Sequence, residues 1–286
     1  MTQILGVDVT SAPRGRKPIT VVRAELMEAY LHVQDVLQFT SLKDFDTWLG
    51  GTRGIVGIDA PLGQPRRLLT HLAEHNPAWM QSWTSYVDLI SGLSKAEFET
   101  LLNSYRATRP KGDKQHLRRC DKLAGACSPM MLYGVPVAKM FFVLTPLLLR
   151  TAVNVPLLRP MPASTCHVLE VYPALVVQAL AKLMPDAGKR ISYKSDTASN
   201  QTSAQQDMRR QMIAALCQGA LAEVYGVRLE LPRKLKDIAV YDTKGDVLDA
   251  VFAAVQAAWA SQQDNFGIPK DADALEGWIS DPLLSW

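Results

Sequence analysis

Hydrophobic residues come in short runs at the start of the chain, a pattern that predicts β-strands. Apolar runs cover residues 4–9 and 19–24, and residues 29–39 have room for a third strand. The first two runs are separated by residues 11–17, which are rich in proline, glycine and charge and predict a turn. Short strands with tight connections are typical of an antiparallel meander.

The apolar spacing then changes to that of a helix. Residues 42–49 carry apolar side chains three and four positions apart. Ser41 and Asp44 resemble a capping box at the start of this helix, and a pair of glycines marks its end. The next apolar run, residues 54–59, predicts a fourth strand. A strand, a helix and a strand in this order indicate a parallel crossover.

Helical periodicity dominates the middle of the chain. No clear strand pattern occurs between residues 64 and 164, so we expect this segment to be a helical insertion. The rest of the chain, residues 1–63 and 165–286, is expected to form the core of the same domain. The helices predicted in the insertion cover residues 66–75, 78–93, 95–105 and 137–153.

After the insertion the pattern again alternates between strand and helix. Residues 166–172 predict a fifth strand that stops at Pro173. Residues 237–246 are polar and predict a turn. The expected helices cover residues 174–183, 203–217 and 247–260. Strands that alternate with helices indicate an α/β protein.

Composition narrows the class of protein further. The 286 residues are 48% hydrophobic and 21% charged, which is typical of a globular chain. The formal net charge of +3 neither indicates nor excludes a nucleic-acid partner. Four cysteines without a CxxC pair argue against a disulfide scaffold or a zinc ribbon and favour a cytoplasmic protein with reduced thiols.

Two features argue against a membrane protein. The chain starts without the cationic and apolar segments of a signal peptide. The strongest apolar run, residues 140–149, is shorter than the stretch of about 20 residues that a membrane span needs. We therefore expect no membrane association.

Acidic residues occur where the predicted strands end. Asp8 interrupts the first strand, Asp59 ends the fourth and Glu170 lies near the end of the fifth. Any one of them fits an ordinary turn position, but charges rarely occur in buried strands unless they are paired or bind metal. The carboxyl ends of parallel strands line the usual ligand crevice of an α/β sheet. A carboxylate cluster there predicts a hard cation, Mg²⁺ or Mn²⁺.

The last predicted helix supplies a fourth acid. With a turn of about 100° per residue, Asp249 lies at the edge of the apolar stripe and can face a cleft beside the sheet. Asp246 falls on the solvated side and is interpreted as the N-cap of the helix. The stripe consists of Leu248, Val251, Phe252, Val255 and Trp259.

The order and spacing of these segments resemble a known family. The segments are Gly6-Val7-Asp8, residues 57–63, residues 170–173, residues 246–250 and residues 276–279. Together they resemble the predicted ribonuclease H-like nucleases catalogued as domain of unknown function 429 (DUF429). The resemblance implies an α/β fold with a ribonuclease H-like core: a five-stranded mixed sheet, three strands antiparallel and then two parallel, flanked by helices.

The resemblance also implies a chemistry and a set of roles. It implies phosphodiester hydrolysis with two divalent ions, which activate a water and stabilise the leaving oxygen. Asp8 would bridge the two ions, Asp59 and Asp249 would each hold one, and Glu170 would be an outer ligand or orient water.

A nucleic-acid partner is also suggested by local positive charge. Residues 105–122 are rich in arginine and lysine, and phosphate backbones favour such patches. Smaller basic clusters occur at residues 14–17 and at Lys189, Arg190 and Lys194. A solvated surface, or salt bridges to the acids, would explain these residues equally well. The candidate contacts are Arg106, Arg109, Lys111, Arg118 and Arg119.

Two other functions stay open at the level of sequence. An actin-like or sugar-kinase-like ATPase has a similar strand order, with Asp8 followed by Thr10 and Ser11 near a nucleotide. Such an enzyme needs a second lobe with a glycine-rich phosphate turn, and residues 64–164 contain no pattern of that kind. The other alternative is a non-catalytic binding module whose acids only accept salt bridges. DNA, RNA and branched substrates all remain open.

Overall fold

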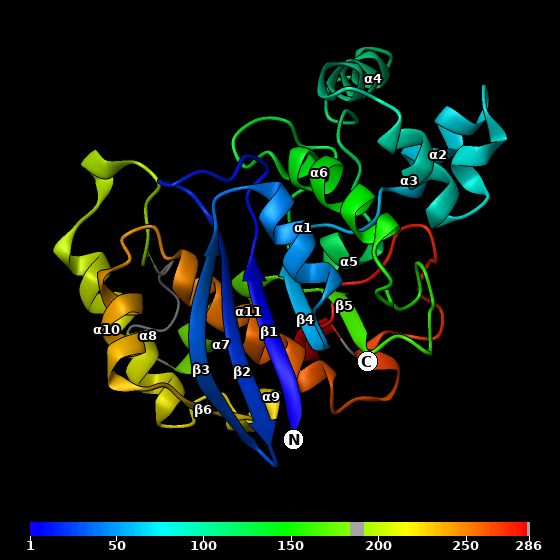
Figure 1. Ribbon diagram of the computed structural model, residues 1–286. Helices are drawn as coiled ribbons and strands as arrows, with labels where there is room; N and C mark the ends of the chain where they lie inside the picture. The colour runs from blue at the N-terminus through cyan, green and yellow to red at the C-terminus, as the bar shows by residue number, and fades with distance from the viewer. Residues whose placement is uncertain (184–191, 285–286) are drawn as a thin grey trace.

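A single mixed sheet lies at the centre of the structure, which is a computed structural model that describes residues 1–183 and 192–284 (Figure 1). Its strand order is β5-β4-β1-β2-β3-β6. β1, β2 and β3 are antiparallel neighbours, whereas β4 runs parallel to β1, β5 parallel to β4, and β6 parallel to β3. The strands are β1 (Thr2–Asp8), β2 (Ile19–Met27), β3 (Tyr30–Phe39), β4 (Gly54–Asp59), β5 (Cys166–Glu170) and β6 (Arg228–Glu230).

The five expected strands are present, and the mixed α/β class is confirmed. The expected number of strands was wrong, because β6 adds a sixth at the edge beside β3. β6 has three residues, and only Leu229 among them is buried. A segment this short has no alternation of apolar and polar positions that sequence periodicity can detect.

The helices before β5 follow the predicted pattern with two exceptions. Ser41 caps α1 by accepting a hydrogen bond from the backbone N–H of Asp44, as expected. The single helix expected over 78–93 is broken, because Ser82 starts a new helix by accepting from the N–H of Ser85. The short α5 was not predicted. The elements are α1 (Leu42–Gly50), α2 (Arg66–Ala73), η1 (Pro77–Met80), α3 (Trp83–Ser91), α4 (Lys95–Ala107), α5 (Arg119–Ala124) and α6 (Val137–Arg150).

The helices after β5 differ from the prediction in part. The first half of the turn expected over 237–246 is helical, because α10 occupies it, and the short α9 was not predicted. The elements are α7 (Pro173–Leu183), η2 (Ala198–Asn200), α8 (Ser203–Cys217), α9 (Ala222–Tyr225), α10 (Arg233–Tyr241), α11 (Asp246–Ala260), η3 (Asp264–Gly267) and η4 (Pro282–Leu284).

The role expected for Asp246 was also wrong. The N-cap of α11 is Gly245, which has a left-handed φ of 74°, and Asp246 is the first helical residue. Asp246 is buried and not solvated. The side chain of Asp242 takes over the capping contact, since its Oδ2 accepts the backbone N–H of Val247 at 2.8 Å. The carboxylate of Asp246 therefore lies in the interior of the protein.

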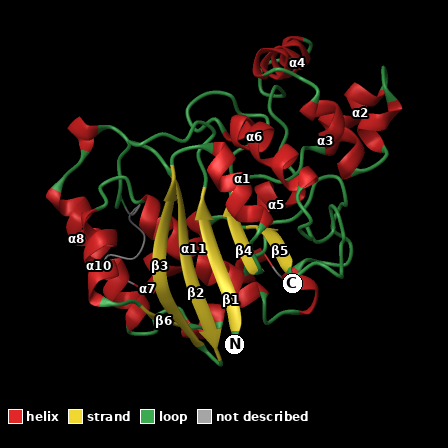
Figure 2. Ribbon diagram, in the orientation of Figure 1, coloured by secondary structure: helices red, strands yellow, loops and turns green. Residues whose placement is uncertain are grey.

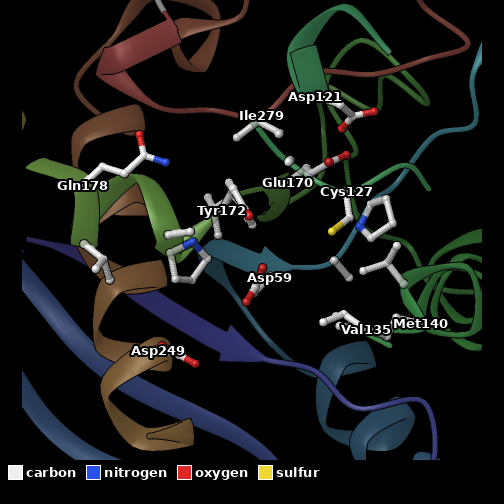
Figure 3. Close-up of a pocket in the computed structure, with 18 of the residues that line it drawn as sticks. Asp59, Asp121, Cys127, Val135, Met140, Glu170, Tyr172, Gln178, Asp249 and Ile279 are labelled. Atoms are coloured by element: carbon white, nitrogen blue, oxygen red, sulfur yellow. The ribbon is translucent and has the colours of Figure 1, made fainter. Parts of the chain in front are cut away.

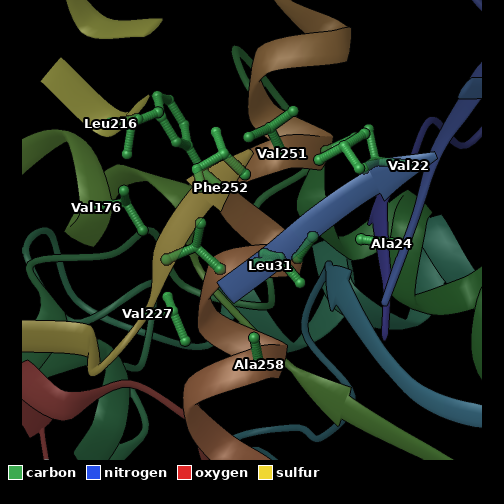
Figure 4. Packing of buried hydrophobic residues seen from close by; sticks show 14 of the residues in the cluster. Val22, Ala24, Leu31, Val176, Leu216, Val227, Val251, Phe252 and Ala258 are labelled. Carbon is green, nitrogen blue, oxygen red and sulfur yellow. The ribbon is translucent and has the colours of Figure 1, made fainter. Parts of the chain in front are cut away.

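Helices cover both faces of the sheet (Figure 2). On one face α11 packs along β1, β2 and β4, and Phe252 of α11 lies among residues of the neighbouring helices and strands, such as Val176 and Leu31 (Figure 4). Two strand glycines allow this approach. A Cβ on Gly6 would lie 2.0 Å from the carbonyl oxygen of Ala250, and a Cβ on Gly57 would lie 2.7 Å from that of Ala253.

The opposite face is shared between α1 and the helices of segment 64–164. Val7 and Ile58 of the sheet belong to one apolar cluster with Tyr86, Phe98 and Phe141 of that segment. The segment therefore extends the core on this face. Within residues 1–183 and 192–284, no helix has both the length and the apolar character that crossing a membrane requires.

Candidate functional site

The sheet register places Asp8 and Asp59 side by side. They are the last residues of β1 and β4, and they are paired in the parallel ladder between these strands, whose axes are about 4.8 Å apart. Gly6 and Gly57, two residues earlier on each strand, face α11. Because side chains alternate along a strand, both carboxylates project to the α11 face.

Asp249 joins them from the first turn of α11. It is 1% exposed and precedes Ala250, whose carbonyl lies against Gly6. The three carboxylates affect each other's protonation. Burial, Asp249 and Asp59 raise the pKa of Asp8 well above its ordinary value. The three acids expected from the sequence are therefore brought together.

Burial and mutual repulsion also act on the other acids of this group. The pKa of Asp59 is raised to about 7, first by burial and then by Asp249. The pKa of Asp246 is raised to about 6 by burial, by Asp242 and by Asp249. A cluster whose members resist ionisation together is typical of a functional site, and it favours a bound cation.

Asp249 is the only one of the three acids with a strong partner among the described residues. Its Oδ1 accepts a hydrogen bond from the Tyr193 hydroxyl at 2.5 Å, and its Oδ2 forms an ion pair with the ammonium of Lys194. In the described ranges, no hydrogen bond or ion pair reaches the carboxylate of Asp8 or of Asp59. These two groups keep their oxygens available for a ligand.

Thr20 adds a polar oxygen next to Asp8. The two residues are paired across β1 and β2, so their side chains share the α11 face. Thr20 is fully buried, and its hydroxyl oxygen has no hydrogen-bond partner within the described ranges. A buried hydroxyl without a partner is costly, and a ligand held by Asp8 would relieve that cost. The donor set is all oxygen, which fits Mg²⁺ or Mn²⁺.

As they stand, the described residues contain no group of three or more His, Cys, Asp or Glu side chains arranged to hold a metal ion. Tyr193 and Lys194 bind the two oxygens of Asp249. Coordination of a cation by Asp249 would therefore compete with these two contacts.

Glu170 lies on the other face of the sheet. It is paired with Ile58 in the ladder between β4 and β5, one position before Asp59, so its side chain points away from α11. The Arg118 guanidinium binds both Glu170 oxygens, with Nη1 to Oε2 at 2.8 Å. Glu170 also accepts the backbone N–H of Leu62 at 2.8 Å. Glu170 nevertheless lines the same cavity as Asp59 and Asp249, and its charge raises the pKa of Asp59, but Arg118 holds both of its oxygens.

Arg118 is the centre of a buried ion-pair network. It is 1% exposed and also binds Asp121, with Nη2 to Oδ1 at 2.7 Å. Its Nη1 donates to the carbonyl of Glu276 at 3.0 Å. Arg118 therefore links α5 of segment 64–164 to β5 and to the C-terminal region. Its charge is neutralised by two carboxylates and is not directed at the three acids.

A cavity of about 1340 Å³ lies next to these groups. Asp59 and Asp249 form part of one wall (Figure 3). Val135, in the loop before α6, and Met140 of α6 form an apolar part of the lining, and Tyr172 lies near Asp59. The cavity therefore joins an acidic end to an apolar surface.

Of the five candidate nucleic-acid contacts, only Arg118 lines this cavity. Arg109 forms an ion pair with Asp113, and Lys111 is exposed in a loop. The guanidinium of Arg106 lies over the ring of Tyr133, 5.3 Å from its centroid. Most of these candidate contacts therefore lie away from the cavity that the acids line.

The remaining basic candidates are spread over the molecule. Arg119 pairs with Asp271 at 2.6 Å and lies over the ring of Trp278. Lys189 and Arg190 fall outside the described residues, whereas Lys194 is at the site itself. Sequence reasoning grouped Lys194 with a loop cluster and missed both Tyr193 and Thr20. Tyr193 and Lys194 lie in an irregular segment, so no periodic pattern pointed to them.

The fold and the site define an α/β protein with a carboxylate cluster where two parallel strands meet a buried helix. The chain belongs to the DUF429 family: the model of that family, described as a protein of unknown function (DUF429), matches residues 6–274. The family expected from the sequence is therefore confirmed. No curated protein and no solved structure is significantly similar to the chain.

Proposed function

We propose that this protein is a nuclease that hydrolyses phosphodiester bonds with Mg²⁺ or Mn²⁺ held by Asp8, Asp59 and Asp249. The observation that carries the proposal is the meeting of these carboxylates on one face of the sheet, with raised pKa values for all three. Clustered carboxylates without enough positive charge are favourable only if a cation joins them.

A ribonuclease H-like core is part of the same proposal. The strand order β5-β4-β1-β2-β3 supports this part of the proposal. β5, β4 and β1 are parallel, β2 is antiparallel to β1, and β3 is antiparallel to β2. β6 is then an addition at the edge. The four free cysteines favour a cytoplasmic location in which thiols stay reduced.

The pKa values support a central place for Asp8 among the ligands. Asp249 and Asp59 both raise the pKa of Asp8, so it is close to both. Asp8 and Asp59 would hold one divalent cation, and Asp8 and Asp249 would hold the other. Divalent cations there would polarise the phosphate, lower the pKa of the attacking water and neutralise charge on the leaving oxygen.

The cavity supports an unpaired nucleic-acid strand as the substrate. Its acidic end suits a phosphate held through cations, and its apolar wall at Val135 and Met140 suits the face of a base. Bases within a duplex are stacked and paired, so a base reaches a cavity of this kind only after it leaves the stack. Tyr133, two residues before Val135, is 63% exposed and offers an aromatic ring for stacking.

The test is metal-dependent cleavage of labelled single-stranded, duplex and branched DNA and RNA. We expect cleavage of the single strand with Mg²⁺ or Mn²⁺, none after chelation with EDTA, and a loss of more than about 100-fold in Asp8→Asn, because even residues that only support a metal ligand cost 10–100-fold. Asp88→Asn, an exposed acid on α3, is the matched control.

Three outcomes would contradict the proposal. Cleavage that survives Asp8→Asn would place the chemistry elsewhere. Hydrolysis of ATP without cleavage of nucleic acid would favour the kinase-like alternative. If neither nucleic acid nor ATP is hydrolysed, and the protein captures a partner only when these acids are intact, a non-catalytic binding module would be favoured.

A further inference from the structure

The Lys194 ammonium already lies where a cation is needed. It is paired with Oδ2 of Asp249, and the Tyr193 hydroxyl binds the other oxygen of the same carboxylate. The side chain of Asp249 is 2% exposed, whereas that of Lys194 is 42% exposed. Lys194 therefore reaches the acid from the open side and covers it.

Lys194 also acts on the other two acids. Its charge lowers the pKa of Asp8 and that of Asp59, in opposition to burial. In return, Asp249 and Asp8 raise the pKa of Lys194 above its ordinary value. The ammonium is thus a shared counter-ion of the cluster and stays charged at neutral pH.

The position of Lys194 is held by the surrounding fold. Its backbone carbonyl accepts the Nε2 of Gln205 at 3.0 Å, and the carbonyl of Tyr193 accepts Nη1 of the buried Arg209 at 2.6 Å. A Cβ on Gly245 would lie 3.0 Å from the Lys194 side chain, so the lysine stem packs directly against the start of α11. This support from α8 and α11 distinguishes Lys194 from a loosely held surface lysine.

We propose that Lys194 fills the second cation position of the site, so that the protein binds one divalent ion, between Asp8 and Asp59, and uses the Lys194 ammonium in place of the other. This inference rests on the proposed metal site and refines it. Within the described ranges, the carboxylates of Asp8 and Asp59 and the hydroxyl of Thr20 have no hydrogen-bond partner, and the three side chains share the α11 face of the sheet. The second cation position, beside Asp249, has its positive charge built into the chain.

The separate roles of the divalent ion and of the Lys194 ammonium follow from the hydrolysis reaction. Water transfers its hydroxyl to phosphorus, the bond from phosphorus to the leaving oxygen breaks, and that oxygen gains a proton. Positive groups around the phosphate oxygens stabilise the charge that these oxygens gain. The ammonium of Lys194 is one of them, and its three N–H groups allow it to contact Asp249 and a phosphate oxygen at the same time.

The test is the number of Mn²⁺ ions bound per chain, measured by electron paramagnetic resonance in a titration without nucleic acid. We expect one ion for the wild type and two for Lys194→Met, because removal of the ammonium frees Asp249 for a second ion. Lys194→Arg keeps the positive charge and should bind one. Lys182→Met is the matched control, since Lys182 lines the same cavity from α7, and it should also bind one.

Two ions in the wild type, or one in both the wild type and a folded Lys194→Met, would overturn the inference. Thermal unfolding shows whether Lys194→Met folds. If it does not, the number of bound Mn²⁺ ions is measured on Lys194→Gln, which has a shorter, polar side chain. A change from one ion to two without any cleavage activity would leave the role of Lys194 standing and overturn the nuclease. If cleavage depends on Asp8 but the wild type binds two ions, the nuclease would stand and the role of Lys194 would be overturned.

Discussion

Asp59 shows at the scale of one residue how a clustered charge affects stability. Its pKa rises from an ordinary value of 3.8 to about 7 in the folded chain. Between these values the folded chain holds a proton that the unfolded chain has released, so the free energy of unfolding falls as the pH rises from about 4 to about 7. Above about pH 7, Asp59 is ionised in the folded chain as well, and the cost of its buried charge lowers the free energy of unfolding in full.

Asp59→Asn should therefore stabilise the protein at pH 8. One pKa unit corresponds to about 1.4 kcal/mol, and because the half-buried carboxylate keeps some hydration, we expect a gain on the order of 2 kcal/mol. The measurement is thermal unfolding in EDTA at pH 4 and at pH 8, with a gain at pH 8 that shrinks at pH 4. Asp88→Asn should change little at either pH. Equal effects of Asp59→Asn and Asp88→Asn would contradict the raised pKa of Asp59.

Glu170 supports a different prediction, because the family resemblance and the structure give it different roles. In the structure it is bound by the buried Arg118 and not grouped with Asp8. Removal of one partner from a buried ion pair costs about 3–5 kcal/mol. We expect Glu170→Gln to lower the free energy of unfolding in urea by about 3 kcal/mol and to leave the affinity for Mn²⁺ unchanged.

The control for this variant is an exposed ion pair. Asp271→Asn removes the partner of Arg119 at the surface and should cost less than about 1 kcal/mol. A Glu170→Gln protein with unchanged stability and a tenfold weaker affinity for Mn²⁺ would instead make Glu170 part of the metal site, as the resemblance implies.

At the scale of elements, the site depends on how closely α11 approaches the sheet. Gly6 is the closest point: a Cβ there would lie 2.0 Å from the carbonyl oxygen and 2.3 Å from the nitrogen of two residues of α11. Backbone atoms in the middle of a helix do not move aside as a side chain can. The helix must shift as a unit, and Asp249 shifts with it, away from Asp8.

Gly6→Ala should therefore affect both stability and metal binding. We expect a loss of about 3 kcal/mol in the free energy of unfolding, at the upper end of the usual overpacking range, and a weaker affinity for Mn²⁺. Gly15→Ala is the control, because a Cβ on Gly15 meets no atom within 4 Å; its stability should stay within about 1 kcal/mol of the wild type. Normal metal affinity in a destabilised Gly6→Ala protein would contradict the link between helix position and site.

The same helix shows what sequence patterns reveal and what they miss. The apolar stripe of α11 predicted its bounds within one residue. Periodicity assumes that one face is solvated, but α11 lies between the sheet and other helices and is buried all round. Its remaining positions are mostly alanine, which is compatible with close packing on every side. That is why Asp246 was expected in solvent and is found in the interior.

The site could be predicted to a similar extent. Acids at strand ends led to Asp8 and Asp59, because the register of parallel strands follows from the crossover between them. The same reasoning led to Glu170, which lines the same cavity, but its ion pair with Arg118 could not be predicted because α5 is far from β5 in the sequence. Lys194 and Thr20 were missed because their roles depend on tertiary neighbours.

At the scale of the whole molecule, the weak net charge of +3 hides a separation of charge. Carboxylates gather where β1 and β4 end. The arginines of residues 105–122 lie in segment 64–164, and several of them are neutralised by nearby acids, as Arg109 is by Asp113 and Arg118 by Glu170. Few of these arginines remain free to bind phosphates, so the binding of nucleic acid should depend only weakly on salt.

Stacking should then contribute more to nucleic-acid affinity than charge does. Tyr133 and Val135 are 63% and 60% exposed in the loop before α6, Arg106 lies over the Tyr133 ring, and Val135 reaches the cavity. A base stacked on an aromatic ring contributes about 1–3 kcal/mol, so Tyr133→Ala should weaken binding of a single strand about tenfold or more. Fluorescence anisotropy of a labelled oligonucleotide, in an Asp8→Asn background that prevents cleavage, measures the effect. Tyr241→Ala, which removes an equally exposed ring from α10, should have no effect; equal losses in the two variants would show that binding is not localised at the cavity.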